Sequence, residues 1–104
     1  MITSAAFAEK RIALVIGNAT YKTAPLKNPV NDASSISSAL TQLGFEVTMK
    51  LNANKRTMKT EISKFGKALA QPNTVGLFYY AGHGIQVDNR NFLIPVNSTI
   101  NGEA

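Results

Sequence analysis

The residues most suited to catalysis follow the apolar segment 74–80, where the chain reads Ala81-Gly82-His83-Gly84. Imidazole titrates near neutral pH and is the commonest general acid or base in proteins. The flanking glycines leave the backbone free to turn tightly, and a side chain in such a loop is poorly placed for the core. His83 is therefore a candidate general acid or base, and a structural or merely exposed histidine is the alternative.

A second candidate is Asp32, which lies at the start of a helix expected over residues 30–43. An acid in the first turn of a helix commonly caps it or complements its macrodipole. The other interpretation is a carboxylate that faces a pocket, because ligands gather at the carboxyl ends of parallel strands, where this helix would begin. Both interpretations stay open on the residues alone.

The composition excludes several other chemistries. The chain contains no cysteine, so disulfides and thiolate metal ligands cannot form within it, and its single histidine argues against a protein zinc site. No apolar run approaches the roughly 18 residues that span a bilayer. We therefore predict no metal, no cofactor and no membrane partner.

The chain is basic, with a net charge of +5 from eleven Lys and Arg against six Asp and Glu. Many of the basic residues fall in one stretch: Lys50, Lys55, Arg56, Lys59, Lys64 and Lys67. Aromatic side chains that could stack on bases are not interleaved with them. Clusters of like charge usually form a solvated face, so we predict no nucleic-acid partner.

Three segments have the pattern of parallel strands. Residues 11–17 form a continuous apolar run, typical of a central strand buried on both faces, and the apolar and aromatic segment 74–80 predicts another buried strand. Residues 45–51 alternate instead, which predicts a strand nearer a sheet edge with one wetter face. The side chains expected on its buried face are Phe45, Val47, Met49 and Leu51.

Two segments have helical periodicity. Residues 30–43 carry apolar side chains three and four positions apart and stop at Gly44. A second helix is expected to begin at Thr57 as N-cap, with Glu61 in its first turn, and to end at Pro72. Its expected core stripe is Met58, Ile62, Phe65 and Leu69.

Alternation of strands and helices with short connections predicts right-handed βαβ units and an α/β fold. After Gly84, residues 85–87 and 92–94 flank a polar segment at 88–91, which predicts a small β-hairpin outside the main sheet. The first strand is followed by Gly17-Asn18-Ala19-Thr20 and not by a GxGxxG or P-loop pattern, so a flavodoxin-like binding domain ranks low.

Both ends of the chain suggest further expectations. Ala6-Phe7-Ala8 has the small-x-small pattern of a signal-peptidase site, so residues 1–10 are interpreted as a tail, either the remnant of a periplasmic or secretory signal or a frayed terminus. A three-stranded parallel sheet with free edges rarely stands alone. We therefore expect residues 11–104 to be the N-terminal portion of a larger domain.

Five segments together resemble the caspase-like cysteine peptidases, in particular their bacterial, metacaspase and paracaspase branch. They are RIALVIGN at 11–18, LKNPVNDA at 26–33, LGFEV at 43–47, FYYAGHG at 78–84 and NFLIPVN at 91–97. Each piece alone is a weak signal, but the ordered set is specific. The resemblance implies a three-layer α/β/α sandwich with a mainly parallel sheet, of which this chain supplies three strands, two helices and the hairpin.

The resemblance also implies a cysteine endopeptidase activity. His83 matches the family's catalytic histidine, and Gly84 matches the position whose backbone N–H contributes to the oxyanion hole. Asp32 matches the acid that selects Arg or Lys in the substrate, while Ala81 stands in that substrate-binding pocket where many relatives have Ser. No counterpart exists here for the acidic cluster that binds calcium in several metacaspases.

The nucleophile is the main departure from the family. Caspases carry their cysteine about 50 residues beyond the histidine, which lies past Ala104, so this chain alone is expected to be inactive. The alternative function is a non-catalytic caspase-like module for assembly or peptide binding. The expected partners are a peptide or protein substrate, and either the remainder of the domain or a second copy of the chain.

Overall fold

The structure, a computed structural model, describes residues 9–98. Its elements follow the order β1 (Lys10–Gly17), α1 (Pro29–Gln42), β2 (Glu46–Leu51), α2 (Lys55–Leu69), β3 (Thr74–Ala81), β4 (Gly84–Val87) and β5 (Arg90–Leu93). This order confirms the predicted succession of strands and helices. The Ala6-Phe7-Ala8 pattern lies outside the described residues. None of the described helices is long and apolar enough to cross a bilayer.

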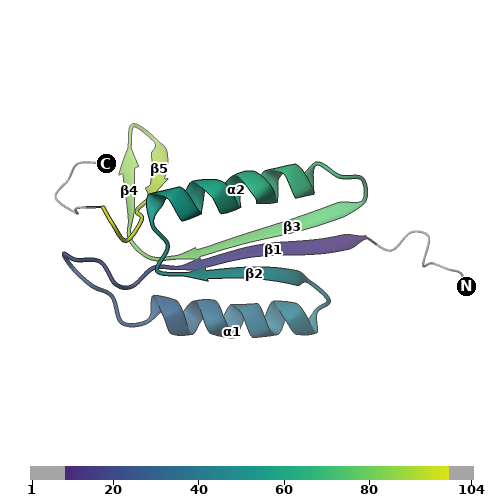
Figure 1. Ribbon diagram of the computed structural model, residues 1–104, viewed down its shortest axis with the longest axis horizontal. Coiled ribbons are helices and arrows are strands. Elements are labelled where there is room, and N and C mark those ends of the chain that lie inside the picture. The colour runs from purple at the N-terminus through teal and green to yellow at the C-terminus, as the bar shows by residue number, and fades with distance from the viewer. Residues whose placement is uncertain (1–8, 99–104) are drawn as a thin grey trace, which may run out of the picture.

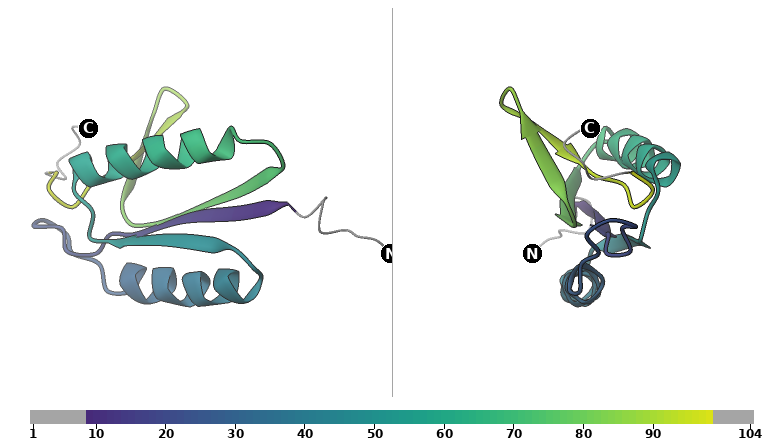
Figure 2. Two further views of the ribbon diagram at one scale, coloured as in Figure 1. Left: turned by 45° about the vertical axis from the view of Figure 1, so that its right-hand side comes forward. Right: turned by 90° about the vertical axis from the view of Figure 1, so that its left-hand side faces the viewer.

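The main sheet places β1 at its centre, in the order β2-β1-β3 with every pair parallel (Figure 1). The two helices cover opposite faces of this sheet, which gives three layers (Figure 2). Side chains of β1 enter the core on both faces: Ala13 and Val15 on the α1 side, Leu14 and Ile16 on the α2 side. The apolar run of β1 was thus interpreted correctly, since this central strand is covered by a helix on each face.

The strands beside β1 are less buried than predicted. In β2, the predicted buried face is confirmed only in part. Val47 packs with the α1-side core, but Met49 and Leu51 are exposed. In β3, which was predicted to be buried, Val75 is 43% exposed and Phe78 is 41% exposed. The prediction was wrong about burial because β3 pairs with β1 on one side and, among residues 9–98, with no strand on the other.

The start of α2 also differs from the prediction. Its N-cap is Asn54, whose side-chain oxygen accepts the backbone N–H of Thr57 at 2.8 Å, so Thr57 lies inside the first turn. Glu61 therefore lies beyond the first turn, where its carboxylate pairs with Lys50 and Lys64 at 3.8 Å each.

The predicted core stripe of α2 is only half correct. Met58 is buried and Phe65 packs against the same core. Ile62 and Leu69 are exposed. Leu69 lies over Gly76 of β3, which pairs with no further strand among residues 9–98. The predicted stop of α1 is confirmed, since Gly44 adopts a φ of +87°, a conformation that favours glycine.

The predicted hairpin forms a separate two-stranded antiparallel sheet. Its turn is shorter than the expected segment 88–91, because Val87 pairs directly with Arg90. The two turn residues, Asp88 and Asn89, have φ values of +50° and +64°. Two successive left-handed residues characterise the tight turn that suits the twist of a hairpin, and Asp and Asn tolerate this conformation well.

Candidate active site

The loops that follow the three parallel strands meet at one edge of the sheet, where both helices also begin (Figure 1). Asn18, directly after β1, is the residue that joins them and has no exposed surface, at 0%. Its backbone N–H donates to the Ala81 carbonyl at 2.8 Å, and its side-chain oxygen accepts the Ala53 N–H at 2.8 Å. Its side-chain amide donates to the Ile94 carbonyl at 3.3 Å. The sequence analysis named Asn18 only within the segment that ends the first strand, so this role was missed.

His83 lies at this edge with its ring half-buried. The ring Nε2 lies 2.7 Å from the carbonyl oxygen of Ala24, and the ring packs edge-on against Tyr21 with centroids 4.5 Å apart. A carbonyl oxygen can only accept, so Nε2 carries the proton of this hydrogen bond. In the neutral imidazole Nδ1 then has no proton and is the atom that can act as a base.

The main chain of His83 is held by two tyrosine hydroxyls. Its N–H donates to the Tyr21 hydroxyl at 3.0 Å, and its carbonyl accepts from the Tyr80 hydroxyl at 2.7 Å. Tyr21 in turn donates to the Ile94 carbonyl at 2.8 Å, and the two hydroxyl oxygens are 3.0 Å apart. Burial, followed by the neighbouring Tyr21 hydroxyl, raises the pKa of Tyr80, so Tyr80 remains a protonated donor.

Glycine at position 82 was expected to permit a tight turn, but the structure gives a different reason for it. Neither Gly82 nor Gly84 has a positive φ. A Cβ at Gly82 would instead lie 2.6 Å from the Tyr80 hydroxyl and 2.7 Å from the Tyr21 hydroxyl. The absence of a side chain at position 82 is therefore what lets both hydroxyls approach the chain beside His83.

Gly84 begins β4 and is exposed, opposite Leu93. Opposed residues of an antiparallel pair alternate between hydrogen-bonded and non-hydrogen-bonded positions. The Ile94 N–H donates to the His83 carbonyl at 3.1 Å, so His83 and Ile94 occupy a hydrogen-bonded position. The next pair, Gly84 and Leu93, therefore occupies a non-hydrogen-bonded position. The N–H of Gly84 therefore points away from β5.

The remaining predicted site residues lie at the same edge of the sheet. Ala81 is the last residue of β3 and is partly buried. Asp32 is exposed in the first turn of α1, whose start packs against the end of β1, where a Cβ at Gly17 would meet Pro29 and Ala33. Within residues 9–98 the Asp32 carboxylate has no hydrogen bond or ion pair, so it does not cap its helix.

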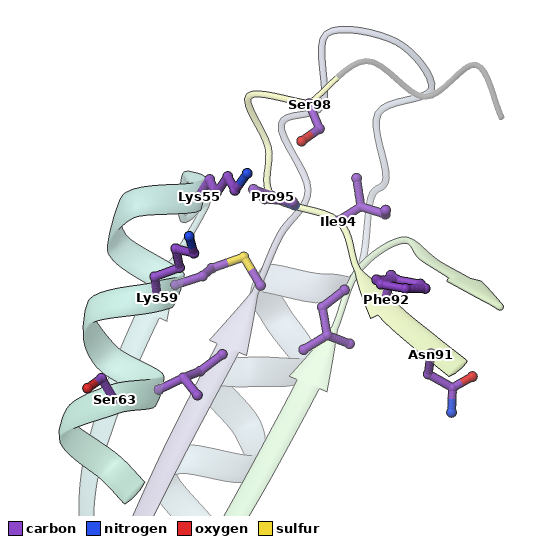
Figure 3. A pocket seen from close by; sticks show the side chains of 11 residues that line it. Lys55, Lys59, Ser63, Asn91, Phe92, Ile94, Pro95 and Ser98 are labelled. Atoms are coloured by element: carbon purple, nitrogen blue, oxygen red, sulfur yellow. The ribbon is translucent and has the colours of Figure 1, made fainter. Parts of the chain in front are cut away.

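Two hollows lie beside β5. One, of about 540 Å³, lies between the end of β3 and the hairpin, and Gly82 and Gly84 both line it. The other, of about 730 Å³, lies between α2 and the segment that follows β5 (Figure 3). Lys55 and Lys59 of α2 border this second hollow. No group of three or more potential metal ligands occurs in the described part of the chain.

Sequence reasoning missed three residues of the site: Tyr21, Ala24 and Tyr80. Tyr80 stood inside a predicted strand, and Tyr21 and Ala24 in a polar loop without periodicity. The available signal was the position of a tyrosine at the end of a strand, where its ring can be buried while its hydroxyl reaches a polar partner. No comparable signal marked Ala24, because it binds His83 through its backbone carbonyl and not through its side chain.

The layers, the parallel sheet and the histidine loop at its carboxyl edge define an α/β protein of the caspase-like type. Comparison with known sequences agrees, since the model of the caspase domain family matches residues 10–103. The chain belongs to this family, as its resemblance predicted.

Two curated relatives are similar to this chain over most of its length. They are the human mucosa-associated lymphoid tissue lymphoma translocation protein 1 and its mouse homologue, each 34% identical over 97 residues. The alignment covers 92% of this chain and 12% of each relative. The chain thus spans about an eighth of the length of the relatives it matches.

Proposed function

We propose that this chain contributes the histidine and part of the substrate pocket of a cysteine endopeptidase that cleaves after Arg or Lys. The observation that carries the proposal is the placement of His83, with Nε2 hydrogen-bonded to the Ala24 carbonyl at 2.7 Å and Nδ1 left as the basic atom. A base must be oriented by a third group to serve a nucleophile, and the Ala24 carbonyl has this role. Membership of the caspase domain family supports the same chemistry.

In the proposed reaction, His83 takes the proton of a cysteine thiol that lies outside these 104 residues. The thiolate attacks the scissile carbonyl carbon, and the C–N bond breaks as His83 protonates the leaving amine. Water then hydrolyses the thioester. The outward N–H of Gly84 is available to stabilise the oxyanion of the tetrahedral intermediate.

We assign the preference for Arg or Lys to Asp32, and we assign Ala81 to the same substrate pocket. The Asp32 carboxylate is exposed at the carboxyl edge of the sheet, without a partner in residues 9–98, and so it is free to pair with a substrate cation. A neutral or acidic substrate side chain would leave this carboxylate unpaired once the substrate covers it, which costs binding energy.

A macromolecular partner is proposed at the free edge of β3. Its unpaired backbone groups and the exposed Val75 and Phe78 provide an edge to which another strand can pair. We assign this edge to the remainder of the domain, and a second copy of the chain is the alternative. Light scattering separates the two, because a monodisperse monomer of the isolated chain rules out the second copy.

The test of the function is a peptidase assay on the full-length gene product with fluorogenic peptides that end in Arg, Lys or Asp. We expect cleavage after Arg or Lys, and a loss of about 10²–10⁴-fold in His83→Ala. Gln86→Ala, an exposed residue of β4, is the matched control and should retain activity. Full activity of His83→Ala would exclude the proposed role of the histidine.

The pocket assignment has its own pair of variants. Asp32→Asn should lower kcat/KM for Arg and Lys peptides by at least about tenfold, because the carboxylate is replaced by a neutral group of the same size. Asp88→Asn, in the hairpin turn, is the control and should leave kcat/KM for these peptides unchanged. If no peptide is cleaved by the folded protein, with calcium tested, the non-catalytic module becomes the better interpretation.

A further inference from the structure

We propose that Tyr21 and Tyr80 are positioning residues, which fix the main chain of His83 so that its ring keeps the tautomer with a free Nδ1. This inference rests on the proposed role of His83 as acid and base. It goes beyond that role, because it assigns the orientation of the ring to two phenol hydroxyls that touch neither a substrate nor a nucleophile.

The first observation is that the two hydroxyls bind both main-chain polar groups of one residue, His83. Tyr21 accepts the N–H of His83 at 3.0 Å, and Tyr80 donates to its carbonyl at 2.7 Å. Each phenol has one proton, and this arrangement uses both, since Tyr21 donates its own to the Ile94 carbonyl at 2.8 Å. The position of His83 is therefore set from two sides.

The second observation links this clamp to the ring. Tyr21 and Ala24 belong to the same short loop, which is closed by a hydrogen bond from the Leu26 N–H to the Ala19 carbonyl at 2.9 Å. When Tyr21 binds the His83 N–H, the same loop brings the Ala24 carbonyl to Nε2 at 2.7 Å. The Tyr21 ring also packs edge-on against the imidazole. Loss of the hydroxyl contact thus removes one of the restraints that place the Ala24 carbonyl.

The third observation is the space made for the hydroxyls. Gly82 has no positive φ that would require glycine, yet a Cβ there would lie within 2.7 Å of both phenol oxygens. The backbone directly before His83 therefore has no side chain at the point where the two tyrosine hydroxyls approach it. Burial and the Tyr21 hydroxyl raise the pKa of Tyr80, so the donor of the clamp is maintained at neutral pH.

Tyr79 provides a matched control within the same strand. It precedes Tyr80 and therefore points to the opposite face, where it packs with the α1-side core. In the described part of the chain its hydroxyl makes no hydrogen bond. Replacement by Phe removes one oxygen from each tyrosine and keeps the ring, so Tyr21→Phe, Tyr80→Phe and Tyr79→Phe differ only in which contact is lost.

The experiment uses His83 as its own reporter, because it is the single histidine of the chain. The ¹⁵N shifts of its two ring nitrogens report the tautomer directly at about pH 8.5, roughly two units above the ordinary pKa of imidazole. We expect the unmodified protein and Tyr79→Phe to show the Nε2-protonated tautomer. Tyr21→Phe and Tyr80→Phe should each show shifts averaged between the two tautomers. Circular dichroism verifies that each variant is folded.

A second measurement needs no variant. The amide of His83 is bonded to Tyr21, whereas the amide of Gly84 points away from β5, so His83 should exchange its amide hydrogen much more slowly than Gly84. Equal exchange rates would overturn the clamp. An unchanged tautomer in both Tyr21→Phe and Tyr80→Phe would overturn the positioning role.

Peptidase assays on the full-length gene product separate this inference from the function on which it rests. We expect kcat to fall about tenfold in Tyr21→Phe and Tyr80→Phe with little change in KM, because a misplaced base slows chemistry more than binding. If the tautomer changes in these variants but His83→Ala remains active, the proposed function fails and the positioning role stands. If His83→Ala is inactive and the tautomer does not change in the tyrosine variants, the proposed function stands and the positioning role fails.

Discussion

The imidazole of His83 binds the carbonyl of Ala24, with Nε2 and O 2.7 Å apart, although the two residues are separated by 59 positions in the chain. Ala24 has a φ of +57°, which costs a non-glycine residue roughly 1–2 kcal/mol. The loop tolerates this strain because hydrogen bonds from Leu26 and through Tyr21 fix it on both sides of Ala24. The basic atom of the proposed site is thus set by a backbone carbonyl and not by an acidic side chain.

Gly82→Ala should destabilise the protein by about 1–3 kcal/mol, because the added methyl group overlaps two buried hydroxyls at 2.6 and 2.7 Å. Gly66→Ala is the control. Position 66 lies within α2, and a Cβ there meets nothing within 4 Å, so alanine should stabilise by about 0.5–1 kcal/mol. Urea unfolding of both variants measures the difference, and equal effects would contradict the close approach at Gly82.

Asn54→Ala should lower the free energy of unfolding by about 0.5–2 kcal/mol, because the side chain of Asn54 caps α2 through the Thr57 N–H. Thr57→Ala should have a much smaller effect, since the Thr57 contact uses its backbone, which the substitution retains. Thermal or urea unfolding of the two variants provides the comparison. A larger loss in Thr57→Ala would instead support Thr57 as the N-cap, as the sequence first indicated.

High pH should destabilise the protein through Tyr80. Its pKa is raised above the ordinary value of 10.0 in the folded state, first by burial and then by Tyr21. The folded state therefore binds the phenol proton more tightly than the unfolded state, and this contribution is complete below about pH 10 and is lost as the pH rises above it. Between about pH 8 and about pH 11, the urea concentration at the midpoint of unfolding should fall less in Tyr80→Phe than in the unmodified protein. Equal falls would show that Tyr80 does not contribute.

Local patterns predicted the elements well, and their burial less well. The existence of all five strands and both helices followed from periodicity, and the end of α1 from Gly44. The exposure of Val75 and Phe78 did not follow, because an apolar strand has the same pattern whether or not a neighbour covers it. The N-cap was misplaced by three residues because Asn and Thr are both accepted caps and Asn54 and Thr57 both stand near the helix start.

The sequence by itself determined the α/β class, the membership of the caspase domain family and His83 as the candidate base. The class and the candidate base follow from contiguous patterns: an apolar run, a helical period, and a histidine between glycines at the end of a strand. The family membership follows from the resemblance of five ordered segments. The tertiary structure alone decided that Tyr21, Ala24 and Tyr80 surround His83, and that Gly82 serves two hydroxyls and not a turn. These contacts join loops that follow different strands, so they depend on where parallel strands end together in space, which no local pattern records.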